Sequence, residues 1–282
     1  MRKTIIILAL ILIGMLIPIG FATSDTQVVI TYGETTMNNA DYKNIVDNFF
    51  VNNAGVDLKN VDSKIITASD VNKISSSISG KTYSSNQIFS SALVDLNDND
   101  NLEVSVDKSK ITTITGDMYL SALKSAGITA GHVYVTSPVT ATGESALAGI
   151  MNSYEVVTNV EIPEPVKEAA NNEIYTQAEI VKNSDVDPEE LSNLVDDVKE
   201  EVQENNVTDH QTIVNIINNY TITYNINITD SDIENLADSI EQIQNVQADI
   251  DNYQLEVSDV LNNTDAGATA DGVEGFLSGL FN

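Results

Sequence analysis

The hydrophobic pattern of this chain changes character at two prolines, Pro163 and Pro165. Before them, short strand-like runs alternate with runs at helical spacing, which predicts strands interleaved with helices. After them, most apolar runs have helical spacing, which predicts a mainly helical region. The sequence therefore predicts an α+β fold, with a mixed α/β domain over residues 25–160 and an acidic, mainly helical region over residues 161–264.

The elements expected before the prolines are short and separated by turn residues. Residues 156–160 are expected to be extended. Thr115 is expected to cap the helix that Gly127 ends, while Ser69 and Thr142 are expected to cap two other helices. The order of the strands in the sheet cannot be predicted from these runs. Strands are expected at residues 28–32, 63–67, 88–96, 102–106 and 132–136, and helices at residues 39–50, 69–79, 117–126 and 144–154.

After the prolines, a helix is expected over residues 164–183. A second helix is expected to start at Pro188, with Asp187 as its N-cap, because proline fits the first helical position. Thr221–Ile228 alternates apolar and polar residues, which predicts a strand, and its asparagines and threonines are poor helix formers.

One long final helix is expected to start after Thr229 or Asp230. Its apolar residues recur every three or four positions as far as Val260, which is typical of a bundle or coiled coil and equally of an ordinary amphipathic helix. Residues 265–282 are expected to form a small-residue linker and a short amphipathic tail, too short to span a membrane.

The first 24 residues have the order of a secretion signal. Arg2 and Lys3 precede an uncharged run, Thr4–Ser24, which contains a helix-breaking Pro18 and ends in small residues. This order predicts export, with the protein extracellular or at the cell surface. The run is also long enough to span a membrane, so the segment is either removed or kept as an N-terminal anchor.

The charge is strongly negative and unevenly distributed. The formal net charge is −29, and residues from Glu161 onward carry 27 acidic and 3 basic side chains. Arg2 is the only arginine, which argues against binding to nucleic acid or to anionic lipid, since both need a basic surface. There is no cysteine, which excludes thiolate metal sites, iron–sulfur clusters and cysteine nucleophiles.

Three stretches in the first half carry a family resemblance. They are Ile111–Ile128, with its Gly116-Asp117-Met118-Tyr119 helix entry, His132–Pro138, and Thr142–Ile150. Together they resemble the YpuA-like secreted proteins, the family called domain of unknown function 1002. The likeness is specific over residues 85–155 and looser from Val28. That family has no established activity, so the resemblance implies secretion and fold without a mechanism.

Few residue patterns in the chain point to catalysis. His132 and His210 fall in different predicted domains, so a zinc site built from several histidines is not expected. Ser145 lacks the glycine spacing of a nucleophile elbow. Paired carboxylates could act as glycosidase acid and base, but with 42 acidic residues almost any pair can be nominated. The first candidates are Asp95, Asp98, Asp100, Glu103 and Asp117.

The segment that most resembles a calcium loop starts at Asp95. Asp95, Asn97 and Asn99 match the first, third and fifth ligand positions of an EF-hand. The match fails at the sixth position, Asp100, and at the twelfth, Val106. A polar hairpin turn rich in asparagine and aspartate is the competing and favoured interpretation.

The sequence thus favours an exported or envelope-associated protein with a non-catalytic binding or structural role, without a cofactor. Its expected partner is an unidentified extracellular or envelope component, reached through an exposed apolar surface. One alternative is an extracellular envelope hydrolase that uses acidic residues of the first domain. The other is a calcium-dependent surface module, with calcium held by Asp95, Asn97 and Asn99.

Overall fold

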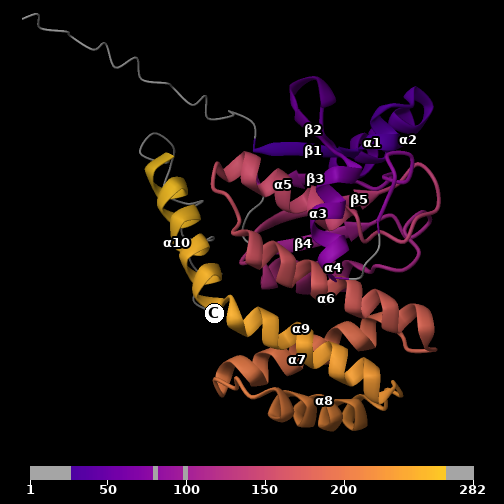
Figure 1. Ribbon diagram of the computed structural model, residues 1–282. Helices are drawn as coiled ribbons and strands as arrows, with labels where there is room; N and C mark the ends of the chain where they lie inside the picture. Colours follow the sequence, from indigo (N-terminus) through magenta and orange to yellow (C-terminus); the bar gives the residue numbers. More distant parts are fainter. Residues whose placement is uncertain (1–26, 79–81, 98–100, 265–282) are drawn as a thin grey trace, which may run out of the picture.

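The computed structural model describes residues 27–78, 82–97 and 101–264 and confirms the predicted fold class. A five-stranded mixed sheet with helices on both faces forms one end of the molecule, and a group of helices extends from it (Figure 1). The predicted signal segment, residues 1–24, and the predicted linker and tail, residues 265–282, lie outside the described residues. Among the described helices, none is long and apolar enough to cross a membrane.

The strand order of the sheet is β2-β1-β3-β5-β4. The outer pairs β1/β2 and β4/β5 are parallel, whereas the central pairs β1/β3 and β3/β5 are antiparallel. The consecutive strands that pair, β1/β2 and β4/β5, are parallel and are joined by crossovers. The hairpin expected around the polar turn after Asp95 is wrong, because β5 lies between β3 and β4 and these two strands do not pair. The strands are β1 (Val28–Gly33), β2 (Asp62–Ile66), β3 (Ser91–Asp95), β4 (Leu102–Val106) and β5 (Gly131–Thr136).

Helices cover both faces of the sheet because its central strands are apolar on both sides. On β3, Ala92 and Val94 face the core formed with α4 (Gly116–Ser125) and α5 (Ala146–Thr158), while Leu93 faces α2 (Ala40–Ala54). The hydroxyl of Thr31 in β1 donates to the carbonyl oxygen of Gly149 at 3.0 Å, so α5 lies very close to the sheet. The short elements α1 (Glu34–Met37), the 3-10 turn η1 (Leu58–Asn60) and α3 (Ala68–Ile78) complete this end.

The predicted boundaries of α4 are confirmed. The Thr115 hydroxyl accepts a hydrogen bond from the Met118 backbone N–H at 3.2 Å. Gly127 follows the helix with φ +77°, and the Ile128 N–H returns to the Leu123 carbonyl oxygen at 3.0 Å. This left-handed turn is the reason that a glycine stands after the helix.

Two predicted caps are wrong. The helix assigned to Ser69 begins one residue earlier, because Thr67 and Asp70 satisfy each other's backbone N–H groups at 2.9 and 3.3 Å. The Thr142 hydroxyl does not reach a helix end but donates to the Glu144 side chain. At the first position Thr67 caps the helix in place of Ser69. At the second, a neighbouring carboxylate accepts from the hydroxyl that the sequence pattern assigns to the backbone.

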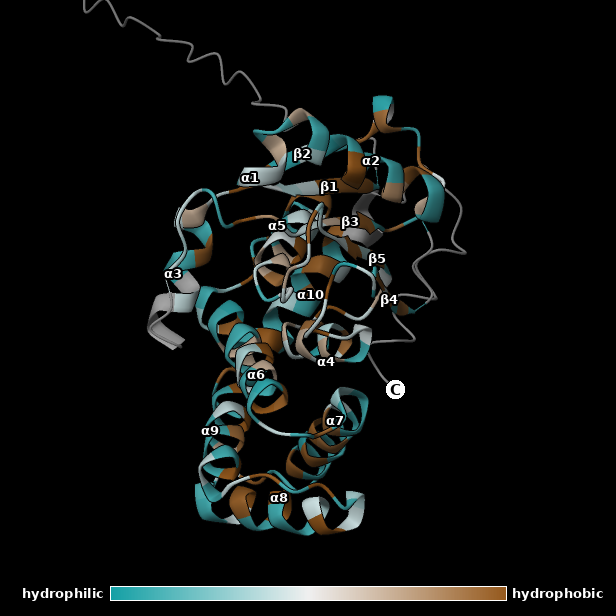
Figure 2. Cartoon of the chain, turned by 90° about the vertical axis from the view of Figure 1, so that its right-hand side faces the viewer, coloured by the Kyte–Doolittle hydropathy of each residue, from teal (hydrophilic) through white to brown (hydrophobic). Residues whose placement is uncertain are grey.

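The remaining helices form the far end of the molecule. Figures 1 and 2 place α6 between the sheet layer and the helices α7, α8 and α9. The predicted start of α7 is confirmed, since the Asp187 carboxylate accepts from the Glu189 N–H at 2.9 Å. These helices are α6 (Glu164–Asn183), α7 (Pro188–Glu204), α8 (His210–Tyr224), α9 (Asp230–Asn245) and α10 (Gln247–Thr264).

The predicted strand at Thr221–Ile228 is wrong, because residues up to Tyr224 belong to α8. The buried residues of α8 include Ile213, Ile216 and Ile217, which follow helical spacing and pack against α7 and α9. Their burial outweighs the low helix propensity of the asparagines and threonines that follow.

The single final helix and the extended segment at residues 156–160 are also wrong. The α5 helix continues to Thr158, and the final apolar stripe is divided between α9 and α10, which meet at Val246. The stripe serves two hydrophobic cores, and the chain changes direction between them (Figure 1).

The first core joins the sheet to α4, α5, one side of α6, the end of α9 at Ile243 and the inner face of α10. The second core is formed by the end of α6 together with α7, α8 and α9. The predicted domain boundary near residue 161 falls between α5 and α6, two helices that share the first core. Because α6 contributes to both cores, it fixes how the sheet layer and the far helices are placed.

Candidate functional site

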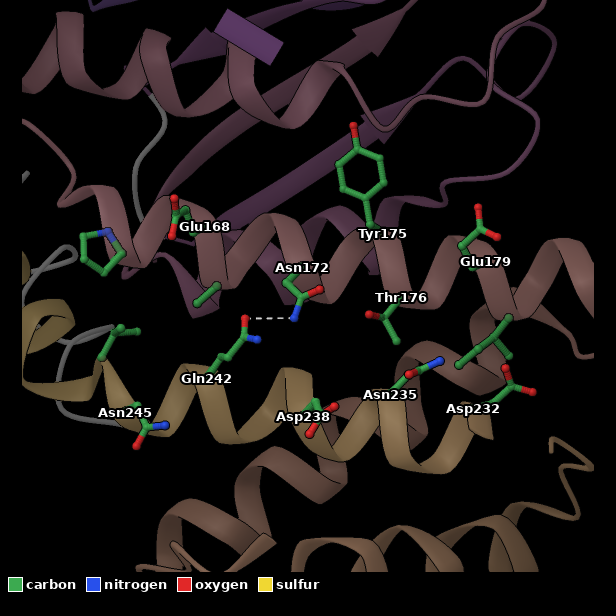
Figure 3. A pocket seen from close by; sticks show the side chains of 14 residues that line it. Glu168, Asn172, Tyr175, Thr176, Glu179, Asp232, Asn235, Asp238, Gln242 and Asn245 are labelled. Atoms are coloured by element: carbon green, nitrogen blue, oxygen red, sulfur yellow. Dashed lines mark hydrogen bonds between the residues drawn. The ribbon is translucent and has the colours of Figure 1, made fainter. Parts of the chain in front are cut away.

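A groove of about 660 Å³ runs between α6 and α9 (Figure 3). Ten of the fourteen residues that line it are polar; eight of the fourteen belong to α6 and five to α9. The Asn172 amide of α6 donates across the groove to the Gln242 side-chain oxygen of α9 at 2.8 Å. The lining residues are Pro165, Glu168, Ala169, Asn172, Tyr175, Thr176, Glu179, Ile180, Asp232, Asn235, Asp238, Gln242, Asn245 and Val246.

The groove follows from the way each helix divides its faces. On α9, the buried Ile233, Leu236 and Ile240 face the second core. The polar residues of α9 recur every three or four positions on a neighbouring face, which is the spacing of one helical stripe. A polar stripe on α6 has the same period. The apolar faces of α6 and α9 are therefore buried in the cores, and the polar stripes of the two helices line the groove between them.

The groove is acidic. Its lining has four carboxylates and four carboxamides, and none of the described residues that line it is basic. Within the described part of the chain, Glu168 has no hydrogen-bond or ion-pair partner. Asp232 accepts from the backbone N–H of Thr229, and Glu179 accepts from Asn183 at 3.4 Å. Such a surface attracts cations and amine groups.

Tyr175 is the aromatic residue of the groove, but it is almost fully buried. Burial, together with the neighbouring Tyr83 hydroxyl at 3.4 Å, raises the pKa of Tyr175 far above its usual range. The phenol therefore stays protonated and can donate or accept a hydrogen bond, but it cannot serve as a base near neutral pH.

The histidines lie far apart in the fold, as predicted. His132 lies in β5, and His210 is the first residue of α8, where the sequence placed a helix start. Hydrogen bonds to Glu234 and Glu241 raise the pKa of His210. Sequence spacing gave no sign that α9 carboxylates surround His210, since they follow it by 24 to 31 residues.

The calcium candidate is described only in part. Asp95 ends β3, and its carboxylate accepts from both the backbone N–H and the side-chain amide of Asn97 at 2.8 Å. These bonds form a turn closed by an aspartate side chain. Asn99 lies outside the described residues, so the calcium site stays a prediction.

Of the carboxylates nominated for hydrolysis, the structure brings two beside one histidine. Asp95 of β3 and Glu103 of β4 are both in register with His132 of β5. Asp117 lies in α4, against the other face of the sheet. Asp98 and Asp100 lie outside the described residues.

His132 also contacts a serine that the sequence did not single out. The Ser105 hydroxyl is 3.0 Å from His132 Nε2, and the Tyr134 hydroxyl is 3.1 Å from His132 Nδ1. The nearest carboxylate oxygen, from Glu103, is 3.7 Å from Nδ1. A catalytic triad needs a direct carboxylate–imidazole hydrogen bond, and here Tyr134 takes that position. Only the parallel pairing of β4 with β5, hidden in the sequence, places Ser105 beside His132.

A second group that sequence reasoning missed is a buried polar network between α4, α6 and α7. Glu173 of α6 is fully buried and accepts from Lys199 at 2.9 Å, and from Ser121 and Ser125 at 2.5 Å each. Lys199 also lies 2.6 Å from the Ser121 hydroxyl. Because Ser121 is buried and the lysine ammonium is held by Glu173 and Asp196, the network links helices and offers no accessible nucleophile.

Comparison with known proteins gives a family. Residues 32–260 match the family described as "Protein of unknown function (DUF1002)". The chain is 32% identical over 200 residues to "Uncharacterized protein YpuA" of Bacillus subtilis (strain 168), an alignment that covers 70% of this chain and 68% of that protein. The comparison with solved structures found no match. Since the family match covers most of the chain, including α6 and α9, this protein belongs to the DUF1002 family.

Proposed function

We propose that this protein is an exported, non-catalytic binding protein whose groove between α6 and α9 takes a linear organic cation of the polyamine class. The observation that carries the proposal is the lining of four carboxylates and four carboxamides, without a basic side chain among the described residues. Export is supported by the signal-like order of residues 2–24.

The carboxylates are spread along the groove. With a rise of 1.5 Å per helical residue, Glu168 and Glu179 of α6 lie about 16 Å apart along the axis, and Asp232 and Asp238 of α9 about 9 Å apart. A chain with ammonium groups separated by several methylenes can meet carboxylates from both helices at once. A single compact cation can meet only those at one place.

The rest of the lining fits the same kind of ligand. Pro165, which is exposed, and Val246, which is partly exposed, provide apolar surface for methylene groups. The carboxamide oxygens can accept from ammonium N–H groups. The volume of about 660 Å³ lies within the range of about 300–1,000 Å³ that is usual for small-molecule sites.

The test is calorimetric titration of spermidine into the full chain at about 0.15 M ionic strength, where weak surface attraction is largely screened. The groove variant carries Glu168→Gln and Glu179→Gln. The matched control carries Asp249→Asn and Glu256→Gln, which remove the same charge from exposed positions of α10.

We expect the groove variant to bind spermidine about fivefold to tenfold more weakly, because two charge contacts of up to about 1 kcal/mol each are lost. The α10 control should bind within about twofold of the original chain. If both variants lose the same affinity, spermidine is held by the general negative field of the surface and the groove assignment is wrong.

A further inference from the structure

The imidazole of His210 is surrounded by carboxylates from one face of α9. His210 Nε2 lies 2.9 Å from a Glu234 oxygen, while Nδ1 lies 3.0 Å from a Glu241 oxygen and 3.5 Å from an Asp238 oxygen. The three acidic residues are spaced by four and three positions, so they lie on one face of α9 over about two turns. His210 is held at the first position of α8 by the preceding N-cap, Asp209.

The two ring nitrogens face different surroundings. Ionised carboxylates only accept hydrogen bonds, so a neutral ring that donates Nε2–H to Glu234 turns its Nδ1 lone pair toward two more oxygens. Three acceptors, Nδ1 and the oxygens of Asp238 and Glu241, then converge with no donor between them. A ring protonated at both nitrogens would supply one positive charge against three carboxylates. Whether His210 is neutral or protonated, the cluster of His210 and its three carboxylates keeps a net negative charge.

The distances between the converging atoms match those between ligands of one small metal ion. Two ligands bonded at about 2.0–2.1 Å in a tetrahedral zinc site lie about 3.4 Å from each other. The two Nδ1 to oxygen distances, 3.0 and 3.5 Å, bracket that value. The ligand atoms of His210, Asp238 and Glu241 all lie within 4.8 Å of one another.

Glu234 is placed to hydrogen-bond to a metal ligand, His210, without binding the metal itself. A histidine that binds a metal usually donates its other ring N–H to a carboxylate, which fixes the ring orientation and increases its basicity. The Glu234 carboxylate accepts from Nε2 in this way, on the side of the ring opposite Asp238 and Glu241. The four residues therefore divide into three converging ligands and one orienting group.

We propose that His210, Asp238 and Glu241 bind one divalent ion of the zinc class, with Glu234 as the residue that positions the His210 ring. Imidazole nitrogen favours zinc and related transition ions over Ca²⁺ and Mg²⁺, which prefer oxygen ligands. Water completes the coordination, since the His210 side chain is about one-third exposed. The ion joins the start of α8 to the middle of α9 above the second core.

The test uses the full chain after treatment with a chelator. Zn²⁺ is titrated calorimetrically near neutral pH, and the visible spectrum is recorded with Co²⁺ as the probe ion. The ligand variants are His210→Gln and, as a nearly isosteric change that preserves the helix, Asp238→Asn. Glu234→Gln tests the positioning residue, and Asp249→Asn removes one exposed charge outside the site.

We expect one ion per chain at micromolar affinity or tighter in the original protein and in Asp249→Asn, with a melting temperature that rises in Zn²⁺. His210→Gln and Asp238→Asn should lose this binding and the Co²⁺ absorption bands. Glu234→Gln should retain the bands but bind about 10–100-fold more weakly. Circular dichroism without metal shows whether each variant is folded.

The proposal is overturned if Zn²⁺ does not bind at micromolar concentration, or if His210→Gln binds it as tightly as the original protein. It is also overturned if Ca²⁺ at equal concentration displaces Zn²⁺, because that result describes a general acidic surface. Asp238 also lines the groove, but the groove test changes only Glu168 and Glu179. Each of the two proposals can therefore fail without the other.

Discussion

Among the described side chains, Glu173 is a carboxylate that the protein encloses completely. It is fully buried in α6 and accepts hydrogen bonds from Lys199, Ser121, Ser125 and Gln177. A buried carboxylate is tolerated only while such donors surround it. The sequence could have suggested this pair, because Lys199 is one of three lysines in a region with 27 acidic residues. Their contact across 26 positions could not be predicted.

Lys199→Met should destabilise the fold by about 3–5 kcal/mol, because it leaves the Glu173 carboxylate buried without its cation. The control is Lys182→Met, at an exposed position near the end of α6, which should cost less than about 0.5 kcal/mol. Urea denaturation of both variants measures the free energies of unfolding. Equal midpoints for the two would show that the buried pair does not stabilise the protein.

Substitution of Gly131 and of Gly55 separates two costs, the strain of a positive φ and the crowding of a new Cβ atom. Both have positive φ, +106° and +68°, but a Cβ on Gly131 would lie 2.4 Å from Leu96 Cδ2, whereas one on Gly55 would meet nothing within 4 Å. Gly55→Ala should cost about 1–2 kcal/mol from the left-handed conformation alone. Gly131→Ala should cost about 1–3 kcal/mol more, because the first core must move. Thermal unfolding ranks them, and a smaller loss for Gly131→Ala would contradict this packing.

At the scale of elements, local signals predicted some helix starts and missed others, such as those assigned to Ser69 and Thr142. The caps at Thr115 and Asp187 are confirmed, and of the two residues expected to start the final helix, Thr229 is the N-cap. Each of these caps depends on bonds within four residues. The division between α9 and α10 was missed because the apolar spacing continues unbroken through it. The stripe passes from the second core to the first between Ile240 and Ile243, shortly before α9 ends, and only the assembled fold contains both cores.

The stability of the contact between α7 and α8 depends on pH through one tyrosine, Tyr224. Tyr224 donates to the Asp197 carboxylate at 2.7 Å, and this hydrogen bond, together with partial burial, raises the pKa of Tyr224 from 10.0 to about 12. The folded state therefore keeps a proton that the unfolded state loses. The stabilisation is complete below pH 10 and is lost as the pH rises through about 12.

Tyr224→Phe should accordingly lower the free energy of unfolding by about 1 kcal/mol below pH 10. The difference from the original protein should shrink as the pH approaches 12, because the original chain then loses the same hydrogen bond. Urea denaturation across this range measures the difference. A gap that stays constant with pH would exclude the Tyr224–Asp197 bond as its cause.

At the scale of the whole molecule, the candidate groove could be predicted only in part. The polar stripes of α6 and α9 are readable as helix faces in the sequence. That they face each other is set by the fold, since Asn172 and Gln242 are 70 positions apart. For the same reason, the sequence treated His210 as a lone histidine, although α9 supplies three carboxylates around it.

We propose that the segment before residue 25 directs the export of the whole protein. Cleavage near Ala22–Thr23 or Ser24–Asp25 should yield a mature protein in the culture medium that starts at Thr23 or Asp25. Intact-mass measurement of the protein from its native host determines this N-terminus. A full-length mass in the membrane fraction would instead indicate a retained anchor, and a full-length mass in the cytoplasm would exclude export.

The central claim is that the groove between α6 and α9 binds a linear cation. It is tested most directly by following backbone amide resonances while spermidine is added. The account predicts that the largest shifts fall on residues 164–183 of α6 and 230–245 of α9, and that they saturate together. Shifts that spread over α7, α8 and α10 in proportion to their surface charge, without saturation, would contradict it.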